Sequence, residues 1–156
     1  MYTVRQGNPA DVPQLARLRA VWSAEQERAP APELTAGDGP PDGFVEDFRH
    51  WAEGNPREFF VAEEDGELIG MVNLLIFERM PKPGKGPSCW VYLGNAYVLP
   101  VHRSAGVGTG LMQAAIAFAR DLGAVRMVLA PSPESADFYA RLGFEPASEL
   151  AVHRFT

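Results

Sequence analysis

Apolar residues recur along the chain with two different periods, which together predict an alternation of strands and helices. Runs rich in β-branched and aromatic residues predict strands at 2–6, 59–63, 68–77, 89–99, 125–130 and 150–155. Apolar spacings of three and four predict helices between Asn8 and Pro30, at about 44–54, at about 107–121, and between Ser132 and Leu142. The run 68–77 is apolar on both faces, which predicts a central strand.

Glycine and proline interrupt this pattern at three places. Residues 29–43 are too rich in both for a regular element, and a loop of this length in a compact domain is functional or disordered. Pro81–Pro87 predicts a broken connection, and Gly94 inside a strand predicts a bulge or a close backbone approach. Neither a repeat nor a domain linker appears, so residues 1–156 are expected to form one α/β domain.

Composition and charge narrow the class of protein. The chain has 156 residues, 46% of them hydrophobic and 22% charged, which is typical of a single soluble domain. The formal net charge of −6 and the lack of a basic cluster argue against nucleic-acid binding and favour a cationic small molecule or peptide. We find no export signal and no apolar run near the roughly 20 residues that span a bilayer, so we expect a cytoplasmic protein that binds no membrane.

Cysteine and histidine give no sign of a metal or redox centre. Cys89 is the single cysteine, so no intrachain disulfide is possible, and it is interpreted as an apolar filler. The histidines at 50, 102 and 153 lack metal-ligand spacing. His102 precedes the glycine-rich turn described next, where a plain loop role is favoured over a phosphate contact. No metal is expected.

The most informative segment is a glycine-rich turn between a predicted strand and a predicted helix. It contains Arg103 followed by glycines at 106, 108 and 110. Backbone N–H groups at a helix start have no helical partner and lie at the positive end of the helix dipole, so they bind phosphate well. Glycine removes the Cβ atoms that would keep a phosphate away.

Several interpretations of this turn compete. A nucleotide P-loop requires Gly-Lys-Ser/Thr, and a dinucleotide fold requires G-x-G-x-x-G near the first strand; the turn meets neither pattern. The pattern Arg-x-x-Gly-x-Gly, formed by Arg103, Gly106 and Gly108, resembles the pyrophosphate loop of the GNAT superfamily of acyl-CoA-dependent N-acyltransferases. The remaining interpretation is a tight strand–helix turn that binds nothing.

A second motif favours the resemblance. Phe138-Tyr139 on a helix, followed by Leu142-Gly143-Phe144, looks like the other hallmark of the GNAT family. The order of elements agrees, and the resemblance covers nearly the whole chain. It implies a three-layer α/β/α sandwich whose mixed, mostly antiparallel sheet contains a splayed strand pair.

The resemblance also implies which residues bind acetyl-CoA. Edge groups of the splayed strand would pair with the pantetheine amides, and an N–H near Val98 could polarise the thioester carbonyl. The loop amides and the Thr109 hydroxyl would hold the pyrophosphate, with Arg103 adding positive charge. The expected cofactor-binding residues are Tyr97, Val98, Leu99, Arg103, Ser104, Ala105, Gly106, Val107, Gly108, Thr109, Ser132 and Ser135.

Tyr139 lies where the family often places its general acid. A phenol with a pKa of about 10 can protonate the departing CoA thiolate if it is well positioned. The alternative is structural, because Gly143 is expected to be a left-handed helix cap that brings Phe144 against Tyr139. Both roles are compatible.

The chain departs from the family pattern in three respects. Where many members have a glutamate base, it has Gly94 followed by Asn95; Glu25, Glu63 and Glu78 are possible substitutes that the sequence does not rank. Ser132 stands where many members have asparagine. Only one strand fits after Phe144, so the acceptor cleft is abbreviated or is completed by a second subunit in a homodimer.

We therefore expect direct attack of an amine on acetyl-CoA, without a covalent enzyme intermediate. The alternative is a non-catalytic acyl-CoA-binding sensor or regulatory module, which the missing strand carboxylate favours. A GNAT-like enzyme acting on an alcohol or a longer acyl donor is a third possibility. Residues 29–54 are expected to form much of the acceptor site, and the sequence does not identify the acceptor.

Overall fold

A computed structural model describes residues 1–28 and 43–156 of the protein. Its centre is a five-stranded sheet in the order β1-β2-β3-β4-β5. The first four strands pair antiparallel and β5 pairs parallel to β4. The strands are β1 Thr3–Gln6, β2 Glu58–Glu64, β3 Glu67–Glu78, β4 Cys89–Val98 and β5 Met127–Val128.

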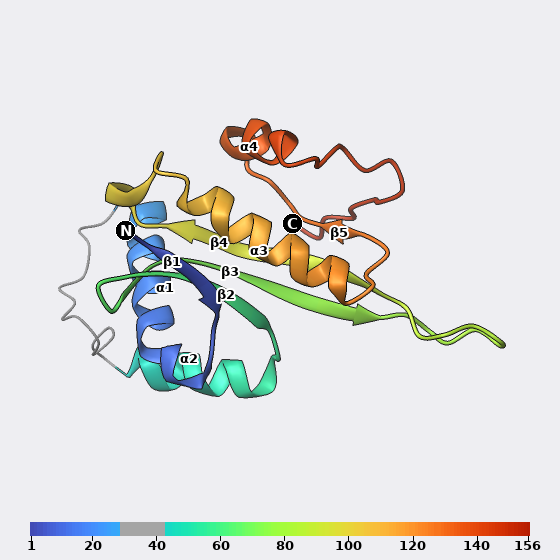
Figure 1. Ribbon diagram of the computed structural model, residues 1–156, viewed down its shortest axis with the longest axis horizontal. Helices are drawn as coiled ribbons and strands as arrows, with labels where there is room; N and C mark the ends of the chain where they lie inside the picture. The colour runs from blue at the N-terminus through green and yellow to red at the C-terminus, as the bar shows by residue number, and fades with distance from the viewer. Residues whose placement is uncertain (29–42) are drawn as a thin grey trace.

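Helices cover both faces of the sheet, so the predicted three-layer arrangement is confirmed (Figure 1). The helices are α1 Val12–Glu27, α2 Phe44–Gly54, α3 Val107–Asp121 and α4 Ala136–Arg141. One core lies between the sheet and α1 with α2, and the other between the sheet and α3 with α4. None of the helices in the described ranges is long and apolar enough to cross a membrane.

The first helix begins within the predicted bounds, and a capping box formed by Asn8 and Asp11 marks its start. The Asn8 side chain accepts a hydrogen bond from the N–H of Ala10 at 2.9 Å, and the Asp11 carboxylate accepts one from the N–H of Asn8 at 2.8 Å. These bonds satisfy donors that have no helical partner. The first turn, Pro9–Asp11, is a 3₁₀ helix that leads into α1.

The strands predicted at 59–63 and 68–77 both form and are joined as the β2–β3 hairpin. Asp65 and Gly66 connect the strands with φ values of 51° and 80°, the left-handed conformations that a two-residue hairpin turn requires. β3 is the third strand of five and is buried from Leu68 to Leu74, which confirms a central strand.

β4 contains the predicted irregularity, one residue beyond Gly94. Gly94 pairs with Asn73 and Tyr97 pairs with Met71, so two residues of β4 oppose one residue of β3. Asn95 lies in this bulge with a φ of 56°, a left-handed conformation that asparagine tolerates better than most residues.

The C-terminal predictions are partly wrong. The strand predicted at 125–130 is reduced to Met127–Val128, and 150–155 forms no strand. An alternating pattern makes a strand only where a neighbouring strand can pair with it, and β5 offers an edge of two residues. The apolar side chains of the tail remain on the surface: Val152 is 73% and Phe155 90% exposed.

Candidate active site

The first part of the site is the open side of β4. β5 pairs with β4 only at Val91 and Tyr92, so the following residues of β4 have no strand on that side in the described chain. The N–H of Leu99 donates to the carbonyl oxygen of Ile69 on β3 at 2.9 Å. Because backbone groups alternate along a strand, those of Val98 point away from β3, towards the open side.

This geometry reduces the number of residues that can present backbone groups to a ligand at the open side of β4. By the same alternation, Tyr97 and Leu99 turn their backbone groups towards β3, so the expectation that all three residues present edge groups is wrong for these two. The Val98 carbonyl oxygen already accepts a bond from Arg103 Nε at 3.0 Å. Among these three residues, Val98 is therefore the one whose N–H is a free donor on the open side.

The second part of the site is the start of α3, which follows β4 after one turn. The first bond of its ladder runs from the N–H of Gly110 to the carbonyl oxygen of Gly106, at 2.9 Å. The N–H groups of residues 107–109 therefore precede the ladder and have no acceptor within the helix. Together with the helix dipole they can bind an anion.

The three glycines of the turn have separate structural roles. Gly106 has a φ of 83°, which favours glycine, and its carbonyl oxygen accepts a bond from the Tyr2 hydroxyl at 3.0 Å. A Cβ on Gly110 would lie 3.3 Å from that hydroxyl, and a Cβ on Gly108 would lie 3.4 Å from Phe138 Cζ. The glycines thus bring β1 and α4 close to the turn as well as baring its amides.

Arg103 is committed to a neighbouring carboxylate. Its Nη1 and Nη2 bind the two oxygens of Glu25 at 2.8 and 2.9 Å, and the Tyr97 hydroxyl donates to Glu25 Oε2 at 2.6 Å. The bonds from Arg103 and then Tyr97 hold the pKa of Glu25 below its usual range, while burial and the bond to Glu25 raise the pKa of Tyr97. We call Glu25, Tyr97 and Arg103 the α1–β4 clamp.

The clamp changes two expectations. The charge of Arg103 is balanced by Glu25, so Arg103 adds less positive charge to the turn than the sequence suggests. A general base needs a pKa raised towards neutrality, and that of Glu25 is lowered. Glu63 binds Arg5 at 3.3 Å, and Glu78 lies at the far end of β3, so neither adjoins Val98.

The remaining predicted loop and helix residues have simple environments. Ser104 and Ala105 are exposed, and Ser104 has a φ of 64°. The Val107 side chain is buried in the core, so this residue can offer a ligand only its backbone. Ser132 and Ser135 precede α4, and their hydroxyl oxygens lie 2.9 Å apart.

Tyr139 lies one aromatic ring away from the start of α3. Phe138 is the member of the pair that packs beside Gly108, whereas Tyr139 contacts Phe138 and Phe144 with ring centroids 5.1 and 5.8 Å apart. Gly143 is the left-handed cap, with a φ of 95°. The contact between Tyr139 and Phe144 is thus as the structural interpretation expected, and burial raises the pKa of Tyr139.

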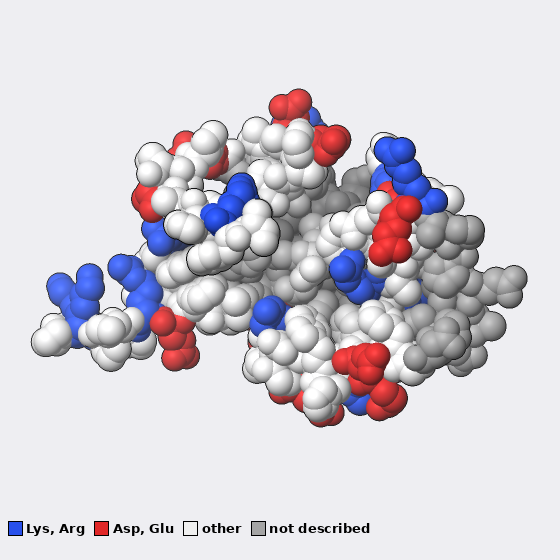
Figure 2. All heavy atoms as spheres, turned by 180° about the vertical axis from the view of Figure 1, so that it is seen from behind, with Lys and Arg blue, Asp and Glu red and all other residues white. Residues whose placement is uncertain are grey.

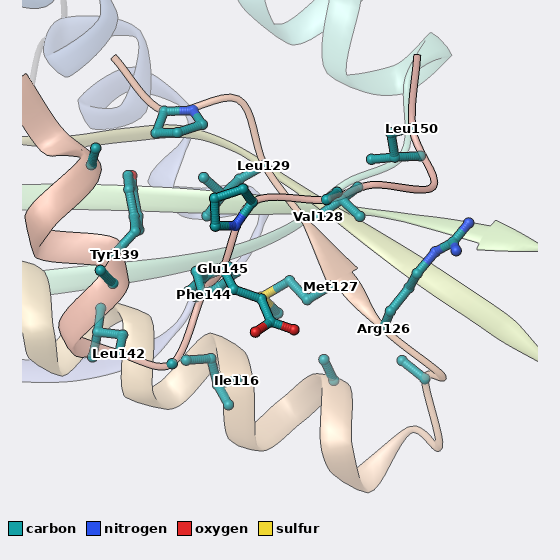
Figure 3. Close-up of a pocket in the computed structure, with 18 of the residues that line it drawn as sticks. Ile116, Arg126, Met127, Val128, Leu129, Tyr139, Leu142, Phe144, Glu145 and Leu150 are labelled. Carbon is teal, nitrogen blue, oxygen red and sulfur yellow. The ribbon is translucent and has the colours of Figure 1, made fainter. Parts of the chain in front are cut away.

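Tyr139 is one of the residues that line a cavity of about 800 Å³ (Figure 3). Its described lining comes from α3, β5, α4 and the tail, including Ile116, Val128 and Leu150. Neither β4 nor the first turn of α3 contributes to it, so this cavity is separate from the Val98 edge. On the face in Figure 2, Lys and Arg are interspersed with Asp and Glu over the described residues.

Sequence reasoning missed the clamp and the partner of Asn95. Asn73 is 2% exposed, and its Nδ2 donates to Asn95 Oδ1 at 2.8 Å. A polar residue inside the apolar run 68–77 was the available signal, because a buried amide must find a partner. The clamp joins residues 78 positions apart and gave no local signal.

An open strand edge beside a helix start with free amides, on a mixed sheet covered on both faces, is the α/β architecture that the resemblance to the GNAT family implied. A sequence profile of the acetyltransferase (GNAT) family matches residues 19–144. The chain belongs to this family, whose members are acetyl-CoA-dependent acyltransferases.

Two relatives and one solved structure illustrate the similarity. A glucosamine 6-phosphate N-acetyltransferase of Trypanosoma brucei brucei is 30% identical over 64% of this chain and 65% of its own length. An aminoglycoside N(6')-acetyltransferase type 1 of Stenotrophomonas maltophilia is 27% identical over 97% and 92%. A predicted acetyltransferase with acetyl-CoA from Clostridium acetobutylicum has the same fold, with a TM-score of 0.69 at 17% identity, covering 99% and 96%.

Proposed function

We propose that the protein moves an acetyl group from acetyl-CoA to a primary amine of a small molecule or peptide, by direct attack. The observation that carries the proposal is the juxtaposition of one free strand donor, the Val98 N–H, with the free amides that begin α3. One group suits a carbonyl oxygen and the others suit a diphosphate. The names of the two curated relatives support a small-molecule amine.

The chain's own groups account for binding and orientation. The N–H groups of 107–109 bind the diphosphate, and the Val98 N–H donates to the thioester oxygen, where negative charge develops. The clamp holds the end of β4 against α1 and so fixes this donor. Geometry of this kind lowers the barrier by orientation as well as by charge.

The transfer is a single displacement through a tetrahedral intermediate. The amine nitrogen forms a bond to the acetyl carbon, and the carbon–sulfur bond breaks with its electron pair on sulfur. The amine loses one proton to water, because Glu25, which Arg103 links to Val98, is already bonded to Arg103 and Tyr97 and has a lowered pKa. The thiolate gains one proton from the Tyr139 hydroxyl, and the resulting tyrosinate is reprotonated through solvent by the proton that the amine released.

Replacing Tyr139 with phenylalanine tests the role of its hydroxyl. We expect kcat to fall by about a hundredfold, because general acid catalysis typically contributes that much or more. The ring and its contact with Phe144 are retained, so acetyl-CoA affinity and the melting temperature should not change. Thiol release measures turnover, and calorimetry measures acetyl-CoA binding.

Two outcomes of this experiment separate the competing interpretations. An unchanged kcat would leave Tyr139 with only its packing role. Acetyl-CoA binding by the wild-type protein without thiol release, across a broad panel of amines, would contradict the proposed transfer.

A further inference from the structure

A second cavity, of about 260 Å³, lies on the α1–α2 side of the sheet. Its floor comes from the strands, with Phe59 on β2, Met71 and Asn73 on β3, and Asn95 on β4. Asn95 is three residues from Val98 along the strand. An acceptor in this cavity therefore approaches the site from the face opposite α3 and α4.

The wall of the cavity is aromatic. Phe44, Phe48 and Trp51 share one face of α2, because their spacings of four and three residues repeat with the helical turn. The Phe48 ring centroid lies 6.4 Å from that of Phe44, 5.6 Å from that of Trp51 and 6.4 Å from that of Phe59. Such a cluster of rings favours an apolar group, and ring faces also attract cations.

Polar groups stand at only a few places around these rings. Asp47 shares the α2 face and is exposed to solvent. The Asn73–Asn95 pair supplies amide groups beside the bulge. Arg19 lies on α1 with its guanidinium stacked on the Trp22 ring, 4.6 Å from the centroid, and its buried Nη1 has no hydrogen-bond partner among the described residues.

The cavity's size restricts what it can enclose. Its volume is about nine times the roughly 30 Å³ that a water molecule occupies in the liquid, which suits a single ring or a branched alkyl group. Hydroxylated sugars would place several donors against four aromatic rings, and buried polar groups without partners are costly. A larger acceptor would leave most of its surface outside the described walls.

We propose that the acceptor is a primary amine carried on a single aromatic or branched apolar group. The apolar group lies among the rings of Phe44, Phe48, Trp51 and Phe59, and the amine lies at the Asn73–Asn95 pair, towards the Val98 edge. Asp47 attracts the ammonium form, which loses its proton before attack. This inference rests on the proposed function and specifies its acceptor.

A panel of matched amines tests the inference by thiol release from acetyl-CoA. It contains 2-phenylethylamine, 3-methylbutylamine, glucosamine, spermidine and phenylalanine, the last being 2-phenylethylamine with an added carboxylate. We expect kcat/KM for the two apolar amines to exceed that for glucosamine and spermidine at least tenfold. A higher kcat/KM with glucosamine or spermidine than with the apolar amines would overturn the inference. A tenfold preference for phenylalanine over 2-phenylethylamine would also overturn it, because the cavity would then bind an amine whose carboxylate pairs with Arg19.

A pair of variants links the preference to the cavity. Trp51→Ala should raise KM for 2-phenylethylamine about tenfold and leave KM for acetyl-CoA unchanged, because Trp51 is 36% exposed and lines only the acceptor side. Phe77→Ala removes a similarly exposed ring, 40% exposed and stacked on Trp90 outside the cavity, and should change neither KM. An unchanged amine KM in Trp51→Ala would contradict the placement.

The panel also separates the two levels of the argument. Thiol release with polar amines alone would contradict the apolar acceptor and leave the proposed transfer standing. Acetyl-CoA binding with no release for any amine would contradict the transfer itself, and the acceptor with it.

Discussion

The two ends of the sheet are built very differently. β1 to β4 form continuous antiparallel ladders, and β3 buries seven consecutive residues between two cores. β5 pairs with β4 over two residues, and the tail that follows α4 stays on the surface (Figure 1). The β1–β4 part of the sheet thus positions the Val98 donor and the cavity under α2. The part formed by β5, α4 and the tail contributes Tyr139.

The segment formed by β5, α4 and the tail is still held by specific contacts. Phe138 packs beside Gly108, and the N–H of Phe144 donates to the carbonyl oxygen of Tyr139 at 3.1 Å across the Gly143 cap. The first contact places α4 against α3, and the second closes the end of α4 on itself; neither involves strand pairing. The difference teaches that this fold can hold the Tyr139 side chain through a helix cap, ring contacts and packing against the core, without a long strand beside it.

The largest expected difference between the two ends is in core truncation. Leu74 on β3 is 0% exposed, so Leu74→Ala should lower the free energy of unfolding by about 2 to 5 kcal/mol through lost burial and a cavity. Val152→Ala, at a side chain 73% exposed, should change it by less than about 0.5 kcal/mol. Chemical denaturation measures both, and an equally large loss in Val152→Ala would show that the tail packs against something.

The second largest effect is expected at the ion pair that joins β1 to α1. Asp11 is buried and accepts bonds from Arg5 Nη1 and Nη2, both at 2.8 Å, and from the N–H of Asn8. Asp11→Asn removes the charge and turns an NH₂ towards these donors, so the free energy of unfolding should fall by about 2 kcal/mol near neutral pH. Glu63→Gln, which loosens a longer and more exposed contact with Arg5, should cost less than about 1 kcal/mol.

The pH dependence of this loss follows from the pKa of Asp11. The bonds from Arg5 lower that pKa in the folded protein, so the stabilisation is complete above the unfolded pKa, about 3.9, and is lost as the pH falls through the folded value. The difference between wild type and Asp11→Asn should therefore shrink below pH about 4. A difference that stays constant with pH would assign the loss to packing.

The sequence predicted β1 to β4 and the start of the first helix well, because the sequence signals for these elements are local. Asn8 with Asp11 marks a helix start, Asp65-Gly66 marks a hairpin, and the uninterrupted apolar run of β3 marks a central strand. Each depends on residues a few positions apart. Leu150–Phe155 failed because a strand also needs a partner, and the partner is absent from the local pattern.

The site was predictable in part for the same reason. The free amides of 107–109 follow from the glycine-rich turn. The restriction of the strand edge to Val98 depends on the parity of pairing with β3, and the clamp depends on α1 meeting β4. Register and tertiary contact of this kind are set by the whole fold and leave no mark in a short window.

The smallest expected effect concerns the clamp, which links α1 and β4 to the glycine-rich turn. Arg103 would bind the diphosphate directly if its charge were free, but both Nη atoms bind Glu25. If the clamp positions the turn, Glu25→Gln and Arg103→Gln should each raise KM for acetyl-CoA about threefold, since the pair is largely exposed. The double variant should then be no worse than either single variant, because both break one interaction. If Arg103 instead binds the diphosphate, Glu25→Gln should free the Arg103 guanidinium and lower KM for acetyl-CoA, and only Arg103→Gln should raise it. Steady-state kinetics on the three variants, with the amine saturating, shows whether Arg103 positions the turn or binds the ligand.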